Sequence, residues 1–204
     1  MPFFLSACAR ALLVGALLPI ASISAAPTST ASHAPSPTSA NSAPRVPALL
    51  AVRKELGPPP AGVTDLKFRD VFKLPVGAKG LEPTEKLLSL DGKRVRIVGF
   101  MVQQEAAPIG AFLLSPLPSM LGDEDESLAD DLPASAIRVE LTKARDLRVP
   151  ALPGLLQLTG TLHVGMRADA SGRSTPAQLT LDAAPERELR SVARAVSKQA
   201  RKPN

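Results

Sequence analysis

The stretch that most constrains the fold runs from Leu90 to Gln103 and reads LDGKRVRIVGFMVQ. Alternate residues in it form one apolar face: Val95, Ile97, Gly99 and Met101. A period of two residues is typical of a β-strand with one buried side. The turn signal Asp91-Gly92 precedes the strand, and Gly99 permits a bend in its middle. We therefore expect the rest of the chain to supply the sheet against which this strand, residues 94–103, closes.

Four further stretches with strand character follow, at residues 111–115, 137–142, 155–165 and 177–182. A hairpin turn at Asp169 to Gly172 joins the last two, and the connection Lys143 to Pro150 separates the third from the fourth. Five strands in this order, the first long and bent, predict a mainly β fold: a small five-stranded barrel of the oligonucleotide/oligosaccharide-binding (OB) type. An open five-stranded sheet with helices on one face is the alternative.

The first 62 residues predict two segments outside this barrel. Arg10 is followed by an apolar run and then by small residues at 24–26, which is the layout of a secretory signal peptide over residues 1–26. Residues 27–62 are rich in Ala, Ser, Thr and Pro and predict a disordered spacer. We expect a periplasmic or otherwise exported protein with no membrane span after cleavage; an uncleaved anchor is the alternative.

Residues 63–184 are then the barrel domain, with short flanking helices. Pro83 to Leu90 predicts one short helix with its leucines inward: Leu87, Leu88 and Leu90. Residues 185–204 form a basic helix or tail. It holds six basic residues against two acidic ones, which accounts for most of the net charge of +5 and leaves the predicted barrel close to neutral. This helix is either simply solvated or contacts a membrane surface or an acidic partner.

The composition excludes several kinds of chemistry. The single cysteine, Cys8, lies in the predicted signal peptide, so the mature chain has no thiol for a disulfide, a zinc site or catalysis. The only histidines are His33, in the spacer, and His163, which we expect to be exposed on a strand. No P-loop, dinucleotide fingerprint or Gly-x-Ser-x-Gly is present. These observations favour a protein that is not an enzyme and has no cofactor, although an enzyme of unrecognised type stays open.

The segment between the second and third strands is unusually acidic, with six carboxylates in nine residues: Asp123, Glu124, Asp125, Glu126, Asp130 and Asp131. Clustered carboxylates repel one another unless solvent, basic groups or a cation compensates, and Ca²⁺ prefers oxygen ligands. The spacing does not match an EF-hand. A solvated loop, a Ca²⁺ site and a docking surface for a basic partner, such as the chain's own C-terminal helix, are the alternatives. Arg94 and Arg96 either balance this loop or face an anionic ligand.

The phrases LDGKRVRIVGFMV, FLLSPLP, LADDLPAS, LTGTLHVG and PAQLTLDAA, in this order, resemble small exported bacterial proteins of unknown function with an OB-like barrel. The resemblance covers Val63 to Ala184 and implies an accessory role in an envelope or transport system. Some of these proteins carry a Cys or His after the FLLSP-like strand. Residues 120–125 here hold neither, so a transition-metal role does not follow.

The leading functional hypothesis is a non-enzymatic exported protein that binds a small molecule or a protein partner. The second is a Ca²⁺-responsive module that uses the acidic segment. Oligonucleotide binding is less favoured, because the sequence has no Tyr or Trp on which bases could stack. We therefore expect no nucleic-acid partner.

Overall fold

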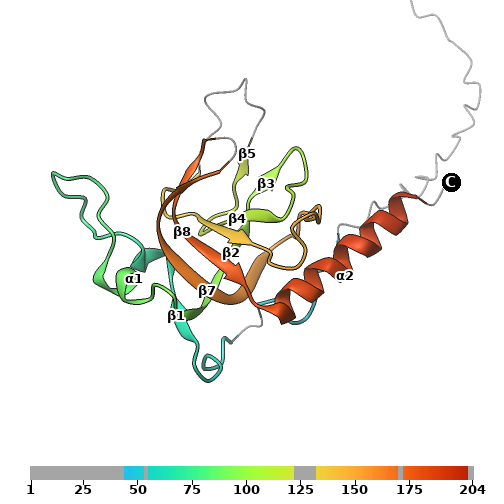
Figure 1. Cartoon of the computed structure of the whole chain (residues 1–204), viewed down its shortest axis with the longest axis horizontal. Coiled ribbons are helices and arrows are strands. Elements are labelled where there is room, and N and C mark those ends of the chain that lie inside the picture. The colour runs from blue at the N-terminus through green and yellow to red at the C-terminus, as the bar shows by residue number, and fades with distance from the viewer. Residues whose placement is uncertain (1–43, 53–54, 122–131, 170–171, 202–204) are drawn as a thin grey trace, which may run out of the picture. The chain divides into compact units, whose positions relative to one another are not determined.

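The chain folds into a mainly β structure in which strand β2 (Arg94–Met101) pairs on both sides (Figure 1). The computed structural model describes residues 44–52, 55–121, 132–169 and 172–201. The other strands are β1 (Thr64–Leu66), β3 (Gln103–Gln104), β4 (Ala111–Ser115), β5 (Met120–Leu121), β6 (Ile137–Glu140), β7 (Leu155–Ala168) and β8 (Ser174–Leu181). The helices are η1 (Phe68–Asp70), α1 (Glu85–Ser89) and α2 (Ala183–Ala200).

Six strands form one mixed sheet in the order β1-β2-β4-β6-β8-β7, and β2 also pairs with β7. The pairings β1–β2 and β6–β8 are parallel and the others are antiparallel. Five of these strands therefore pair in a cycle, β2-β4-β6-β8-β7, that returns to β2. Each of the five stretches predicted as strands overlaps one member of this cycle.

The alternating faces expected from the sequence are the faces that build the core. In β2, Val95, Ile97 and Met101 are buried, and in β7 the leucines at 156, 158 and 162 are fully buried. Leu179 of β8 joins the same cluster. Aliphatic side chains dominate it because the sequence has only six Phe and no larger aromatic residue.

Two strand ends differ from the prediction. The strand predicted over residues 94–103 ends at Met101, because Gln103 and Gln104 leave the main sheet and pair in parallel with β5. At the other end of the sheet, β7 continues past Gly165 and β8 begins earlier, at Ser174. The register shifts there between Val164 and Arg167, opposite Pro176. Proline has no backbone N–H to donate, and the bulge accommodates this gap so that pairing resumes beyond it.

Segments outside the predicted strands also contribute to the core. Residues 64–66, for which no strand was predicted, form β1, which lies parallel to β2. The predicted helix near 83–90 is α1, with Leu87 and Leu90 buried, but Leu88 is 48% exposed and the expectation that it points inward is wrong. A five-residue helix has only one buried side, and Leu87 occupies it.

The ordered domain extends further toward the N-terminus than the predicted boundary near Gly62. Leu50, placed in the spacer by its Pro-rich surroundings, is fully buried in the core. Its carbonyl accepts a hydrogen bond of 2.7 Å from the backbone N–H of Gln157, and Ala51 pairs with Leu156. The segment around Leu50 thus pairs with β7 and adds an apolar side chain to the core.

The predicted basic helix is α2, which follows β8 directly (Figure 1). Its first turn is anchored by Glu186, which is 2% exposed. The two carboxylate oxygens of Glu186 accept hydrogen bonds from the backbone N–H groups of Thr142 (3.0 Å) and Lys143 (2.7 Å), just after β6. No helix in the described ranges is long and apolar enough to cross a membrane.

Candidate functional site

The residues predicted as a Ca²⁺ site lie outside the part of the chain that the structure describes: Asp123, Glu124, Asp125, Glu126, Asp130 and Asp131. Within the described ranges, no group of three or more His, Cys, Asp or Glu side chains is arranged to hold a metal ion. His163, on β7, is half-buried opposite Gln178 of β8.

Each of the two arginines of β2, predicted either to balance the acidic segment or to face an anionic ligand, has a carboxylate partner among the described residues. Arg94 donates to Asp182 through Nη2 at 2.6 Å, and this bond raises the pKa of Arg94 above its ordinary value. Arg96 pairs with Asp65 of β1. The acidic segment that these two residues were predicted to balance lies outside the described residues.

The burial of Arg96 on β2 is unexpected for a charged residue, because its side chain is only 6% exposed. Its backbone is in register with Asp65 in the parallel pairing of β1 and β2. The guanidinium donates from Nε to Asp65 Oδ1 at 2.6 Å and from Nη2 to Asp65 Oδ2 at 2.8 Å, a bidentate pair. Nη2 also donates to the carbonyl of Gly57 at 2.9 Å. One side chain thus joins β2, β1 and the segment before β1.

The electrostatics of the pair follow from these contacts. The hydrogen bond from Arg96 holds the pKa of Asp65 below its usual range, although partial burial acts in the opposite direction. The same bond raises the pKa of Arg96. Both groups are therefore charged at neutral pH, and Asp65 is a poor candidate for a general base.

A pocket of about 430 Å³ lies beside this pair. Its lining combines apolar and charged residues: Leu56, Gly57, Pro58, Asp65, Leu66, Lys67, Phe68, Arg96 and Val98. The volume is within the range of small-molecule sites, which are largely apolar with a few polar groups. None of these lining residues is a serine, cysteine or histidine.

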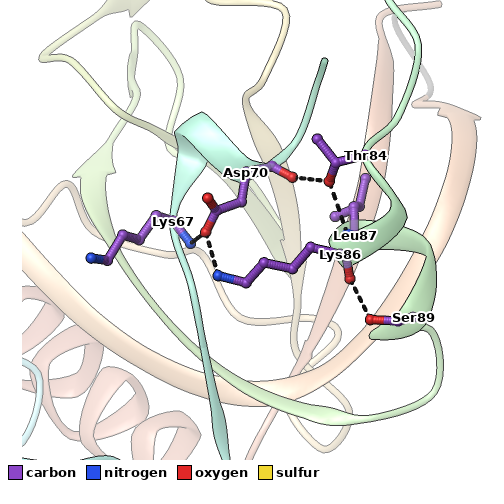
Figure 2. Close-up of polar contacts among 6 residues, drawn as sticks. All are labelled: Lys67, Asp70, Thr84, Lys86, Leu87 and Ser89. Carbon is purple, nitrogen blue, oxygen red and sulfur yellow. Dashed lines mark hydrogen bonds and ion pairs between the residues drawn. The ribbon is translucent and has the colours of Figure 1, made fainter. Parts of the chain in front are cut away.

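Lys67 supplies the free positive charge of this pocket. Its backbone N–H donates to Asp70 Oδ2 at 3.3 Å, but the carboxylate of Asp70 is paired with the ammonium of Lys86 at 2.6 Å. Figure 2 shows the Lys67 ammonium pointing away from both. Among the described residues, no carboxylate pairs with it, whereas Asp65 neutralises Arg96. The lining therefore has an excess of one positive charge.

The side chains around Asp70 fix the wall that carries Lys67 (Figure 2). The hydrogen bond from Lys86 lowers the pKa of Asp70. The hydroxyl of Thr84 donates to the Asp70 carbonyl and accepts from the N–H of Leu87 at 3.0 Å, which caps the start of α1. These contacts tie η1 to α1 from two sides and so hold the turn after β1 in place.

Gly99 has a second role beside the bend inferred from the sequence. A Cβ atom at this position would lie 2.7 Å from Cε2 of Phe68 and 2.8 Å from the carbonyl oxygen of Ser115. The absence of a side chain lets the Phe68 ring pack directly against β2, and Phe68 forms part of the pocket wall. Gly99 of β2 therefore shapes the pocket as well as the sheet.

Sequence reasoning missed this site because its parts are distant along the chain. Asp65 and Arg96 are 31 residues apart, and a lone Asp in a three-residue strand has no pattern around it. The available signal was Arg96 itself, a charged residue on a strand whose neighbours Val98 and Phe100 make that face partly apolar.

Comparisons with known proteins give little further guidance. No family model matches the chain, and no curated protein matches it. Among solved structures, a DUF3299 family protein from Pseudomonas aeruginosa PAO1 is similar, with a TM-score of 0.38 and 13% sequence identity over 59% of this chain and 93% of that chain. The similarity is too distant to assign a fold or a function, so the functional argument depends on the site itself.

Proposed function

We propose that this chain is an exported, non-enzymatic binding protein whose cyclic strand pairing forms an OB-like barrel, and that the pocket beside β1 and β2 binds a small anion with an apolar body. The barrel is supported by the cycle β2-β4-β6-β8-β7 and by the parallel pairing of β6 with β8. Export is supported by the signal-peptide pattern of residues 1–26. An accessory role in an envelope or transport system fits both.

The observation that carries the ligand class is the composition of the pocket. Leu56, Pro58, Phe68 and Val98 supply apolar surface for a hydrocarbon body, while Lys67 supplies an ammonium with no carboxylate partner among the described residues. An anion placed there gains a charge pair, whereas a cation meets an excess of positive charge. The Arg96–Asp65 pair holds the wall in place without taking up that charge.

Displacement of a fluorescent probe tests this proposal. Anilinonaphthalene sulfonate, an apolar anion, is bound to the purified chain and displaced with decanoate or with decylammonium, which share a ten-carbon chain and differ in charge. We expect decanoate to displace the probe at concentrations at least fivefold lower than decylammonium. Equal potency of the two competitors contradicts a role for the positive charge.

Two variants and a control assign the binding to this pocket. Lys67→Gln removes the ammonium and is expected to weaken decanoate binding about fivefold, the upper end for a solvent-exposed ion pair of ~1 kcal/mol. Val98→Trp fills the pocket and is expected to abolish displacement. Lys79→Gln removes an exposed lysine that does not line this pocket and should change nothing. Displacement that is unchanged in both pocket variants overturns the proposal.

A Ca²⁺-responsive role of the acidic segment is the second candidate, favoured by the six carboxylates within residues 123–131. Calorimetric titration with millimolar CaCl₂ tests it on the same preparation. Heat of binding together with a raised melting temperature supports this role, because a ligand that binds only the folded state stabilises it. Unchanged heats and an unchanged melting temperature leave a solvated segment. Oligonucleotide binding has no comparable support, since no Tyr or Trp exists in the chain.

A further inference from the structure

A second, strongly basic groove lies on α2, apart from the pocket beside β1. It has a volume of about 590 Å³ and is lined by residues of α2 and of the segment after β6: Asp146, Leu147, Arg148, Ala193, Arg194, Ser197, Lys198 and Arg201. None of these residues lines the first pocket. Four of them are cations and only one is a carboxylate.

The spacing of the basic residues places them on one side of the helix. Arg187, Arg190, Arg194, Lys198 and Arg201 follow one another at intervals of three and four residues. Residues three and four apart lie on the same helical face, so they form one stripe. At a rise of 1.5 Å per residue, the stripe extends over about 21 Å.

The cations of the groove are not used elsewhere in the described fold. Arg190 donates to Glu186 at 3.4 Å, but Arg148, Arg194, Lys198 and Arg201 have no hydrogen-bond acceptor or carboxylate partner for their side chains among the described residues. Such a concentration of unpaired like charge costs free energy through mutual repulsion. An anionic partner would remove that cost.

The surroundings of the stripe favour one kind of anion. A membrane-surface helix inserts its apolar face into lipid, but the apolar face of α2 is occupied: Leu189 is fully buried and Ala193 is 6% exposed. Single-stranded nucleic acid is bound with aromatic stacking, and the groove has no aromatic side chain. The groove instead has cations on both of its sides and apolar surface from the half-buried Leu147, which suits a peptide with acidic and apolar residues.

We propose that the groove between α2 and residues 146–148 docks an acidic segment of a partner protein. Arg194, Lys198 and Arg201 on the helix side, with Arg148 on the opposite side, pair with its carboxylates. Leu147 contacts an apolar residue of that segment. The proposal concerns a different surface from the pocket beside β1, so either can fail without the other.

Fluorescence anisotropy with a labelled peptide that alternates glutamate and leucine tests the proposal on the purified chain. The variant Arg194→Glu/Lys198→Glu is compared with Lys79→Glu/Arg167→Glu, which makes the same change in net charge at exposed residues outside the groove. We expect the groove variant to weaken peptide binding at least tenfold and the control variant less than twofold. Binding should also weaken when NaCl is raised from 50 to 300 mM.

Three results overturn the proposal. The first is equal weakening by both double variants, which indicates general attraction to a basic protein. The second is that the parent chain does not bind the peptide at 50 mM NaCl, while the two double variants have the same melting temperature as the parent chain. The third is that the chain binds vesicles of 25% phosphatidylglycerol or a labelled dT15 oligonucleotide more strongly than it binds the peptide, and that the groove variant loses this binding.

Discussion

Asp65 and Arg96 lie opposite each other in the parallel pairing of β1 with β2, and their side chains form a bidentate pair at 2.6 and 2.8 Å. The backbone pairing of β1 with β2 and the ion pair between the two side chains thus both hold these two strands together at the same position. Because β1 has only three residues, this pair and the bond from Arg96 to the Gly57 carbonyl supply much of what holds it against β2. The pocket beside β1 depends on the same contacts.

The Arg96→Met variant keeps an unbranched side chain of similar length and removes the charge. We expect a loss of about 2 kcal/mol in the free energy of unfolding, the range for hydrogen bonds to charged groups. Arg94→Met is the matched control, because Arg94 is half exposed in its pair with Asp182 and its loss should destabilise the chain less than the loss of Arg96. Urea denaturation measures both; equal losses would contradict a special role for Arg96.

The contribution of the Asp65–Arg96 pair depends on pH with a defined sign. Arg96 lowers the pKa of Asp65 in the folded chain, so the stabilisation is complete above the ordinary Asp pKa of about 4. It is lost as pH falls through the still lower folded value. Asp65→Asn should therefore be less stable than the parent chain at pH 7, and this difference should shrink between pH 4 and pH 2. A difference that grows on acidification contradicts the assignment.

Gly160 of β7 lies between β2 and β8. It pairs with Val95 of β2 and with Leu181 of β8, and a Cβ atom here would lie 2.3 Å from the carbonyl oxygen of Thr180. Gly160→Ala should cost at least about 3 kcal/mol, because strand backbone must move to admit the methyl group. Gly77→Ala is the control, since no atom lies within 4 Å of its Cβ position. Thermal unfolding of the two variants should differ clearly; similar melting temperatures would show that the strands can separate at little cost.

Glu186 links the first turn of α2 to the chain after β6. Glu186→Gln replaces one of the two acceptor oxygens with an NH₂ group, so the backbone N–H of Thr142 or Lys143 loses its partner in a part-buried position. The expected loss is about 2 kcal/mol. Hydrogen exchange should report faster exchange at one of these two amides and in α2, with β2 and β7 unchanged. Uniformly faster exchange throughout the sheet would mean that Glu186 stabilises the whole domain rather than this junction.

Four strands of the cycle, β2, β6, β7 and β8, were predictable because apolar residues alternate along them. β4 was predictable as a short apolar run, and all five of its residues are buried. β1 was not predictable in this way, since three residues carry no period. The inward orientation of Leu88 was wrong because a run of leucines does not show which one the short helix buries. The burial of Arg96 depends on a carboxylate 31 residues away, which no local pattern reveals. Local density of charge instead favoured residues 123–131, which lie outside the described residues.

Chemical-shift mapping with ¹⁵N-labelled protein and sodium decanoate tests the central claim, that the pocket beside β1 and β2 is the binding site, most directly. The largest amide shifts should occur at residues 56–57, 65–68 and 96–98, with small shifts in α2. Lys67→Gln should reduce these shifts at the same decanoate concentration. Shifts confined to other parts of the chain, or none at millimolar decanoate, would contradict the account.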